Sequence, residues 1–186
     1  VDLCGHATLA TAHVLFQHEG YAAQSINFQS KSGLLTVTKS GDTLTLDFPT
    51  DPIQEVPLTS ELTAGFNVKP IKAFKGKTDY MLIYDNQEQI TDLEFDLRLI
   101  SKVNARGIIL TAPGKDVDFV SRFFAPQSGV DEDPVTGSAH TSLTPFWSKA
   151  LGKKELTAIQ MSPRKGYLHC QDLGDRTKIS GKAITY

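Results

Sequence analysis

Two short segments combine glycine with side chains that can bind a substrate or carry a proton. The first is Cys4-Gly5-His6-Ala7-Thr8-Leu9, and the second is Thr136-Gly137-Ser138-Ala139-His140-Thr141. Both contain Gly-x-Ala, and each precedes the most apolar helix-like segment in its half of the chain. The two segments form a rough internal repeat, and we expect each of them to start a helix at a turn.

Such a turn can bind an anion. A helix N-terminus offers N–H donors without intrahelical partners and a partial positive charge, and glycine lets a ligand approach the backbone closely. Two such termini that face each other would form a cradle suited to a carboxylate. We therefore predict that Gly5 and Gly137 contribute to substrate binding. The alternative is that Gly137 and Ser138 only cap a helix.

Three acidic residues, Asp131, Glu132 and Asp133, stand directly before the second turn. Pro134 restricts Asp133 to extended geometry, so this side chain is held in place. An Asp, a Ser and a His near an anion site are sufficient for proton transfer. The alternatives are a solvated acidic loop for Asp131 and Glu132, and a carboxylate that only satisfies the helix dipole. A serine hydrolase is a further rival, but the chain lacks the G-x-S-x-G turn.

The cysteines and the other histidines give little sign of a metal site or a disulfide. Cys4 and Cys170 form no C-x-x-C pair. We expect each to be a small buried apolar residue, although Cys4 stands before a helix start, where a thiolate is favoured. No H-E-x-x-H motif is present, and His13, His18 and His169 are interpreted as ordinary histidines. We therefore predict no metal site.

Composition excludes several classes of protein. The 186 residues carry 19 Lys and Arg against 21 Asp and Glu, which gives a formal net charge of −2. Nucleic-acid-binding proteins usually show a basic excess, and no apolar run approaches the roughly 18 residues of a membrane span. The phosphate-binding motifs G-x-G-x-x-G and G-x-x-x-x-G-K-[ST] are absent. We expect a cytoplasmic protein without a nucleic-acid or membrane partner.

Hydrophobic periodicity predicts helices and strands in mixed order. Helices are expected over 6–18 and from about 137 to 152, with a period-two hairpin between them at 35–38 and 44–48. Further expected strands and short helices follow Pro57. This order indicates an α+β fold with largely antiparallel sheets. Three prolines between Pro49 and Pro57 mark the best boundary, which divides the chain into residues 1–51 and 52–186.

At the glycine turns the sequence resembles the phenazine-biosynthesis PhzF-like family, whose members are relatives of diaminopimelate epimerase. The matching motifs are Leu3-Cys4-Gly5-His6-Ala7-Thr8 and Glu132-Asp133-Pro134-Val135-Thr136-Gly137-Ser138-Ala139-His140. Weaker matches include Gln160, Ser162 and Arg164. The resemblance covers nearly the whole chain, and the two long motifs together are specific.

The resemblance implies a fold of two pseudo-symmetric lobes, each a curved mixed sheet around a central helix, with the active site in the cleft between them. It implies an isomerase that moves a proton on a small carboxylate-bearing substrate without a cofactor. In the family's isomerase, a dihydro-hydroxyanthranilate loses a proton at one carbon and regains one at another. By motif position, His6 and Asp133 would relay protons, and Gly5 and Ser138 would bind or orient the substrate. An imidazole can both accept and donate a proton near neutral pH.

The sequence departs from the family pattern in three places. The family's principal general base is a Glu that precedes the G-H-A-T turn, and the sequence opens at Val1, so we expect residues 1–51 to be the remainder of a truncated N-terminal lobe. Relatives that racemise amino acids use two cysteines, whereas Thr136 occupies the second position here. Many relatives have Arg-Gly-Gly where this chain has Arg164-Lys165-Gly166.

Two hypotheses from different classes remain. The leading one is a PhzF-like isomerase with a small carboxylate-bearing metabolite as its partner and, by resemblance, a homodimeric assembly. The alternative is a binding protein of the same fold that lacks the upstream Glu and therefore the chemistry. The gene sequence upstream of Val1 would distinguish them.

Overall fold

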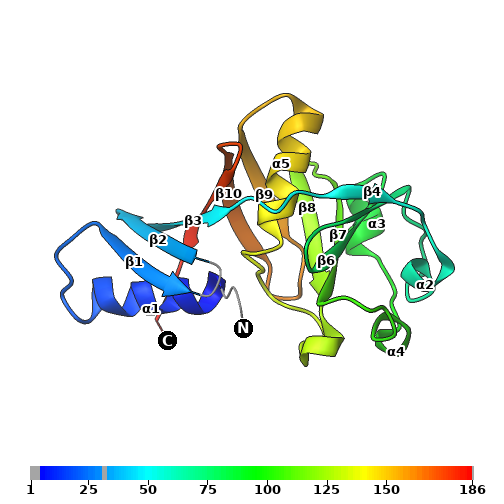
Figure 1. Ribbon diagram of the computed structural model, residues 1–186, viewed down its shortest axis with the longest axis horizontal. Coiled ribbons are helices and arrows are strands. Elements are labelled where there is room, and N and C mark those ends of the chain that lie inside the picture. The colour runs from blue at the N-terminus through cyan, green and yellow to red at the C-terminus, as the bar shows by residue number, and fades with distance from the viewer. Residues whose placement is uncertain (1–4, 31–32, 186) are drawn as a thin grey trace. The chain divides into compact units, whose positions relative to one another are not determined.

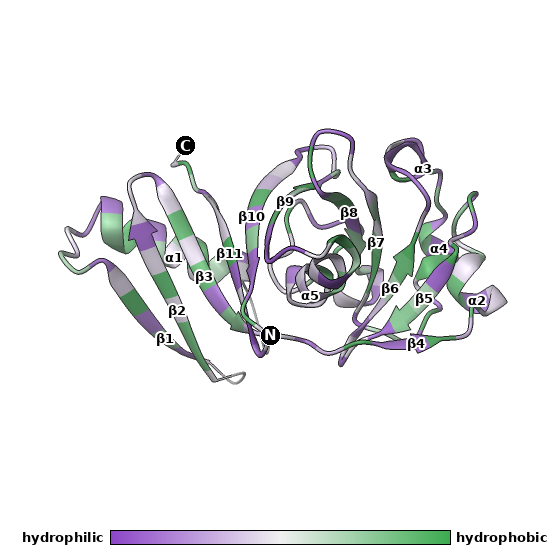
Figure 2. Ribbon diagram, turned by 90° about the horizontal axis from the view of Figure 1, so that it is seen from above, coloured by the Kyte–Doolittle hydropathy of each residue, from purple (hydrophilic) through white to green (hydrophobic). Residues whose placement is uncertain are grey.

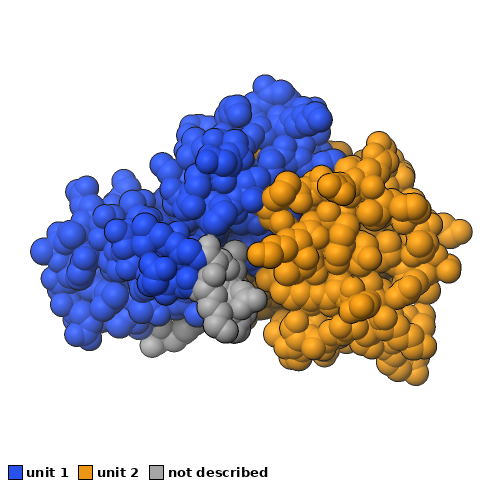
Figure 3. All heavy atoms as spheres, viewed as in Figure 1, with its two compact units in different colours: residues 1–50, 136–155, 168–186 blue, residues 51–135, 156–167 orange. Residues whose placement is uncertain are grey.

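The computed structural model describes residues 5–30 and 33–185, which group into two compact units (Figure 3). Unit 1 contains residues 1–50, 136–155 and 168–186, and unit 2 contains residues 51–135 and 156–167. The chain leaves unit 1 at the proline-rich segment and returns to it twice. These units alternate along the chain, whereas the predicted lobes are two continuous segments, residues 1–51 and 52–186. The division into lobes stays a prediction.

Unit 1 is an antiparallel sheet with two long helices. Its strands lie in the order β1, β2, β3, β11, β10. Helix α1 packs against β2 and β3, and α5 packs against β11; Figure 1 shows α1 alongside β1 and β2. The bounds are α1 Gly5–Gln17, β1 Ser25–Ser30, β2 Gly33–Ser40, β3 Thr43–Pro49, α5 His140–Leu151, β10 Gly166–Asp172 and β11 Arg176–Lys182.

Period-two patterning forms the sheet of unit 1. In β3, every second residue is buried, and these residues are Leu44, Leu46 and Phe48. Leu46 pairs with Val37 of β2 and with Ile179 of β11, so one apolar row crosses three strands. Such cross-strand apolar pairs stabilise a sheet and fix its register. The helix expected over 6–18 and the hairpin expected at 35–48 are confirmed.

Unit 2 is a mixed sheet with short helices. Its strands lie in the order β4, β5, β6, β7, β8, β9, and the pairs β6–β7 and β8–β9 are parallel. The other pairs are antiparallel, as expected for largely antiparallel sheets. The bounds are β4 Gln54–Val56, α2 Ser60–Thr63, β5 Lys72–Lys75, β6 Asp79–Ile83, α3 Gln87–Thr91, α4 Leu97–Ile100, β7 Gly107–Pro113, β8 Phe119–Phe124, the 3₁₀ helix η1 Pro126–Ser128 and β9 Glu155–Gln160.

Burial on both faces distinguishes the central strands of unit 2. All six residues of β8 are buried, as are six of the seven in β7. Strands that are covered on both faces are typically rich in apolar residues, and Figure 2 colours most of β6 as hydrophobic. Arg122 is the charged exception in β8. No helix among the described residues is long and apolar enough to span a membrane.

Candidate active site

The structure brings the two glycine turns together within unit 1. A Cβ atom added to Gly5 would lie 3.5 Å from the Cα of Gly137 and 3.3 Å from Cζ of Phe48. A Cβ atom on Gly137 would lie 3.7 Å from the Cα of Gly5 and 3.6 Å from Cε2 of the same ring. Phe48 on β3 is fully buried, so its ring forms a fixed floor under both turns. The N-termini of α1 and α5 therefore meet, as an anion cradle requires.

The turn at Gly137 and Ser138 is closed by hydrogen bonds between residues three positions apart. The His140 N–H donates to the Gly137 carbonyl at 3.0 Å, and the Thr141 N–H donates to the Ser138 carbonyl at 3.2 Å. These are three-residue spacings, so a 3₁₀-like turn precedes the α-helix. Helix α5 accordingly begins at His140, three residues later than the sequence predicts, and it ends before Gly152, which adopts φ 68°. Ser138 lies half-buried in this turn.

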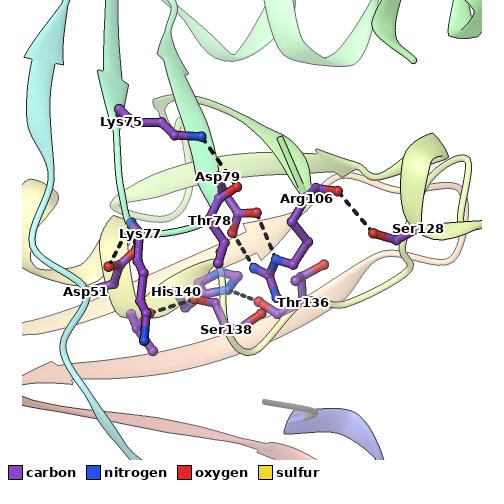
Figure 4. A network of polar contacts seen from close by, with 11 residues as sticks. Asp51, Lys75, Lys77, Thr78, Asp79, Arg106, Ser128, Thr136, Ser138 and His140 are labelled. Atoms are coloured by element: carbon purple, nitrogen blue, oxygen red, sulfur yellow. Dashed lines mark hydrogen bonds and ion pairs between the residues drawn. The ribbon is translucent and has the colours of Figure 1, made fainter. Parts of the chain in front are cut away.

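His140 holds the turn from inside. Its side chain is fully buried, and Nδ1 lies 2.8 Å from the Thr136 carbonyl (Figure 4). Because a carbonyl only accepts, Nδ1 carries the proton and donates it. Burial lowers the pKa of His140 to about 4, although the bond to Thr136 opposes that shift. His140 is therefore neutral near pH 7 and acts as a structural pin.

The low pKa of His140 predicts a pH-dependent stability. The unfolded imidazole titrates near its ordinary value of 6.5, so protonation favours the unfolded chain below that pH. We expect the free energy of unfolding to be constant above pH 6.5 and to fall by about 3 kcal/mol as the pH decreases to 4. Urea unfolding of the wild type and of His140→Asn between pH 4 and pH 8 measures this pH dependence of the free energy of unfolding, which should be smaller in the variant. The exposed His169→Asn variant is the control and should keep the wild-type slope; an unchanged slope in His140→Asn would contradict the assignment.

His6 is the second residue of α1 and is exposed. Its position follows directly from Gly5, because the helix begins at that glycine. His6, Gly5, Gly137 and Ser138 all belong to unit 1, whereas Asp133 belongs to unit 2. The joint action of His6 and Asp133 in one proton relay therefore stays a prediction.

Asp133 is half-buried in the loop between η1 and α5, and backbone bonds fix its main chain. Its N–H donates to the Phe123 carbonyl at 3.0 Å. Its carbonyl accepts from Nε2 of the fully buried Gln160 at 2.7 Å. The next carbonyl, that of Pro134, accepts from the Ser162 hydroxyl at 2.8 Å. The expectation that Asp133 is held in place agrees with these bonds.

The acidic neighbours of Asp133 differ from each other. Asp131 is exposed, as the solvated-loop interpretation expects. Glu132 is not solvated: only 12% of its side chain is exposed, and it forms a two-bond ion pair with Arg122. The solvated-loop interpretation is therefore wrong for Glu132, because a buried arginine on β8 supplies the partner that an isolated carboxylate would lack.

Arg164 and Lys165 occupy an exposed turn before β10. Lys165 has φ 54°, in the left-handed region that favours glycine. This backbone agrees with the glycine that the resemblance places there in many relatives. A side chain on Gly166 would overlap Val135, so this glycine lets the turn pack against the loop that carries Asp133.

Within the described ranges, no three or more His, Cys, Asp or Glu side chains gather closely enough to hold a metal ion. Cys4 lies outside the described residues, so its predicted position before α1 is not tested. Cys170 is a free, buried thiol, and burial raises its pKa to about 12.

Because thiolate is the reactive form, we expect Cys170 to be inert in the folded protein. In a Cys4→Ser variant, Cys170 is the remaining cysteine. This variant should react with an aromatic disulfide reagent only after guanidinium unfolds it. Reaction of the native variant as fast as that of the unfolded chain would show an accessible thiol instead.

The sequence did not indicate two residues that contact predicted site residues or their neighbours in the structure. Phe48 looked like one more alternating strand residue, and Arg122 stands in an aromatic run without a helical or acidic neighbour. The role of Phe48 depends on contacts with turns far away in the chain, and that of Arg122 depends on the loop after η1 folding back on β8. Gln160 and Ser162 did give a signal, because both belong to the weaker motif matches of the resemblance.

The fold matches that of known proteins. The chain superposes on a probable proline racemase from Agrobacterium radiobacter with a TM-score of 0.63 at 11% identity, covering 98% of this chain and 65% of that one. That likeness shows the fold, which is of the diaminopimelate epimerase-like type. The predicted fold class is confirmed.

The family follows from closer matches. The model of the phenazine biosynthesis-like protein family, PhzC-PhzF, matches residues 1–186. An uncharacterised isomerase of Pseudomonas aeruginosa is 45% identical over 185 residues, which are 99% of this chain and 70% of that protein. A crystal structure of a PhzF-family protein from Enterococcus faecalis superposes with a TM-score of 0.94 at 40% identity, covering 99% of this chain and 71% of that one. The chain belongs to this family, and a general isomerase role is supported.

Proposed function

We propose that the protein is a cofactor-independent isomerase that moves a proton on a small carboxylate-bearing substrate. The observation that carries this proposal is the meeting of Gly5 and Gly137 over the ring of Phe48. Two helix N-termini at one point concentrate N–H donors and partial positive charge, which suits a carboxylate. The chain belongs to a family that includes proteins named as isomerases, and this membership supports the same reaction class.

The proposed roles follow from position. The backbone at Gly5 and Gly137 binds the carboxylate, and Ser138 in the second turn orients the substrate. His6 and Asp133 carry protons to and from the reacting carbons. The backbone of Asp133 is fixed at its N–H and its carbonyl, which suits a general acid or base, since proton transfer needs defined geometry.

A serine hydrolase is the weaker rival. Its Ser138 would need a histidine base, and His140 lies two residues away. His140 is fully buried, donates from Nδ1 to a carbonyl and has a pKa lowered to about 4. An imidazole with that pKa is a weak base near neutral pH. We expect no covalent labelling of Ser138 by a fluorophosphonate.

Solvent deuterium exchange tests the proposed function. The natural gene product that contains this sequence, dialysed against a chelator, is incubated in D₂O with a dihydro-hydroxyanthranilate and with a panel of small hydroxy and amino carboxylates. We expect NMR to show C–H replaced by C–D in at least one carboxylate and in none of the matching carboxamides. Binding without exchange would instead indicate a non-catalytic protein. The homodimer is part of the same proposal, and sedimentation velocity tests it.

A further inference from the structure

One buried ion pair outside the proposed machinery stands directly beside Asp133. Arg122 on β8 is 7% exposed. Its Nε donates to Oε1 of Glu132 at 2.7 Å, and its Nη2 donates to Oε2 at 2.9 Å. The remaining nitrogen, Nη1, donates to the Ile90 carbonyl at 3.3 Å. The guanidinium thus engages both carboxylate oxygens, and such a fork fixes direction as well as distance.

Aromatic rings fix the guanidinium itself. The rings of Phe95 and Phe124 lie 5.1 Å and 5.0 Å from its central carbon, measured to their centroids. Cation–π contacts at these distances are stabilising, more so where water is excluded. Arg122 therefore has one defined position, and Glu132 is held to that position. A lysine would keep the charge but lose the planar fork and the stacking.

The same strand anchors Asp133 through its backbone. Asp133 donates to the carbonyl of Phe123, the residue after Arg122. Between them the chain closes on itself, since Ala125 and Val130 exchange two backbone hydrogen bonds at 3.1 and 3.2 Å. Adjacent residues of β8 thus hold adjacent residues of the loop: a side chain holds Glu132 and a carbonyl holds Asp133.

We infer that Arg122 and Glu132 are positioning residues that set the orientation of Asp133 for proton transfer, an inference that rests on the proposed function. The pair acts through the backbone, because Glu132 and Asp133 share a peptide bond. Glu132 therefore fixes where the Asp133 side chain leaves the loop. A small misplacement of a catalytic group can lower a rate by about 100-fold.

Arg122→Lys and Glu132→Gln test this inference, with Arg176→Lys as the matched control. Arg176 also forms an Arg–Asp ion pair within a sheet: its Nε lies 2.7 Å from Oδ1 of Asp47, and its Nη2 donates to the Asp47 main-chain carbonyl at 2.9 Å. This pair lies in unit 1 and is more exposed than the Arg122–Glu132 pair. We expect both test variants to lower kcat by about 10- to 100-fold with KM changed by less than about threefold. The double variant should be no slower than the slower single variant, because paired residues act as one unit. Arg176→Lys should lose stability only and keep its kcat.

A second measurement needs no substrate. We expect amide hydrogen exchange over residues 131–136 to become faster in Arg122→Lys and Glu132→Gln than in Arg176→Lys. Unchanged exchange in that segment, or a kcat no lower than that of Arg176→Lys, would overturn the inference. The wild-type protein and Asp133→Asn separate the possible failures. No exchange by the wild type removes the proposed function, and normal turnover by Asp133→Asn removes the proposed role of Asp133. An inactive Asp133→Asn beside a fully active Arg122→Lys removes only the positioning role.

Discussion

Replacing Asp133 by Asn is expected to lower the rate of solvent deuterium exchange by about 10²- to 10⁴-fold, the usual contribution of a general acid or base. The change keeps the shape of the side chain but removes its ability to carry a proton. The backbone bonds of Asp133 to Phe123 and Gln160 do not depend on the carboxylate, so the fold should survive. His6→Ala is expected to cause a similar loss. NMR in D₂O measures both rates.

Two controls make this result specific. Asp131→Asn is the same substitution two residues earlier, at an exposed position, and should leave the rate within about twofold, as surface changes usually do. His13→Ala changes a histidine on the same helix as His6 and should behave likewise. Exchange at the wild-type rate in both Asp133→Asn and His6→Ala would refute their roles.

Gly137→Ala is expected to weaken substrate binding without unfolding the protein. The added methyl group would make ordinary contacts at 3.6 Å with Phe48 and 3.7 Å with Gly5, and Gly137 does not have the positive φ that strains alanine. Folding stability should therefore stay the same or rise slightly. The methyl group would nevertheless stand between the two turns, against Gly5 and the Phe48 ring, and we expect it to move the backbone N–H groups away from the positions that bind the carboxylate. We expect KM to rise by at least about 10-fold, the effect of losing one or two charge-assisted hydrogen bonds.

Gly41→Ala gives the opposite pattern and serves as the control. Gly41 lies in the turn between β2 and β3 with φ 58° and open space around it. Alanine there should cost about 1 kcal/mol of stability and leave KM unchanged. Thermal unfolding and steady-state kinetics on both variants separate stability from binding. A Gly137→Ala protein with the wild-type KM would show that no ligand approaches the backbone there.

Local signals in the sequence were sufficient for the longer elements and for the two turns of the cradle, whereas the short helix α3 and the short strand β4 were not predicted. Gly5 and Gly137 each stand before an apolar helical segment, and both do begin a helical turn. The sequence suggests that the two turns could face each other, but it does not indicate that they meet at Phe48. That meeting depends on β3 packing under two turns that are 132 residues apart in the chain. Contacts over such separations are set by tertiary packing.

The burial of charged and titratable side chains was harder to predict from the sequence than the elements were. Glu132 in an acidic run looked solvated, and nothing in the sequence paired it with Arg122, which lies in an aromatic strand. A strand arginine becomes a buried partner only when the loop after η1 folds back on β8. His140 is similar: its neutral, buried state depends on the Thr136 carbonyl and on the packing around α5.

A substrate carboxylate bound by the amides of both turns is the step on which the other roles depend, and an NMR titration tests it directly. ¹⁵N-labelled protein is titrated with a turned-over carboxylate and with its carboxamide. The predicted result is that the carboxylate shifts the amide signals of Gly5, His6, Gly137 and Ser138 together, with one Kd, and that the carboxamide does not. Shifts confined to one turn, equal shifts with the carboxamide, or shifts centred on the open hollow lined by Phe16, Tyr21 and Lys39 would contradict it.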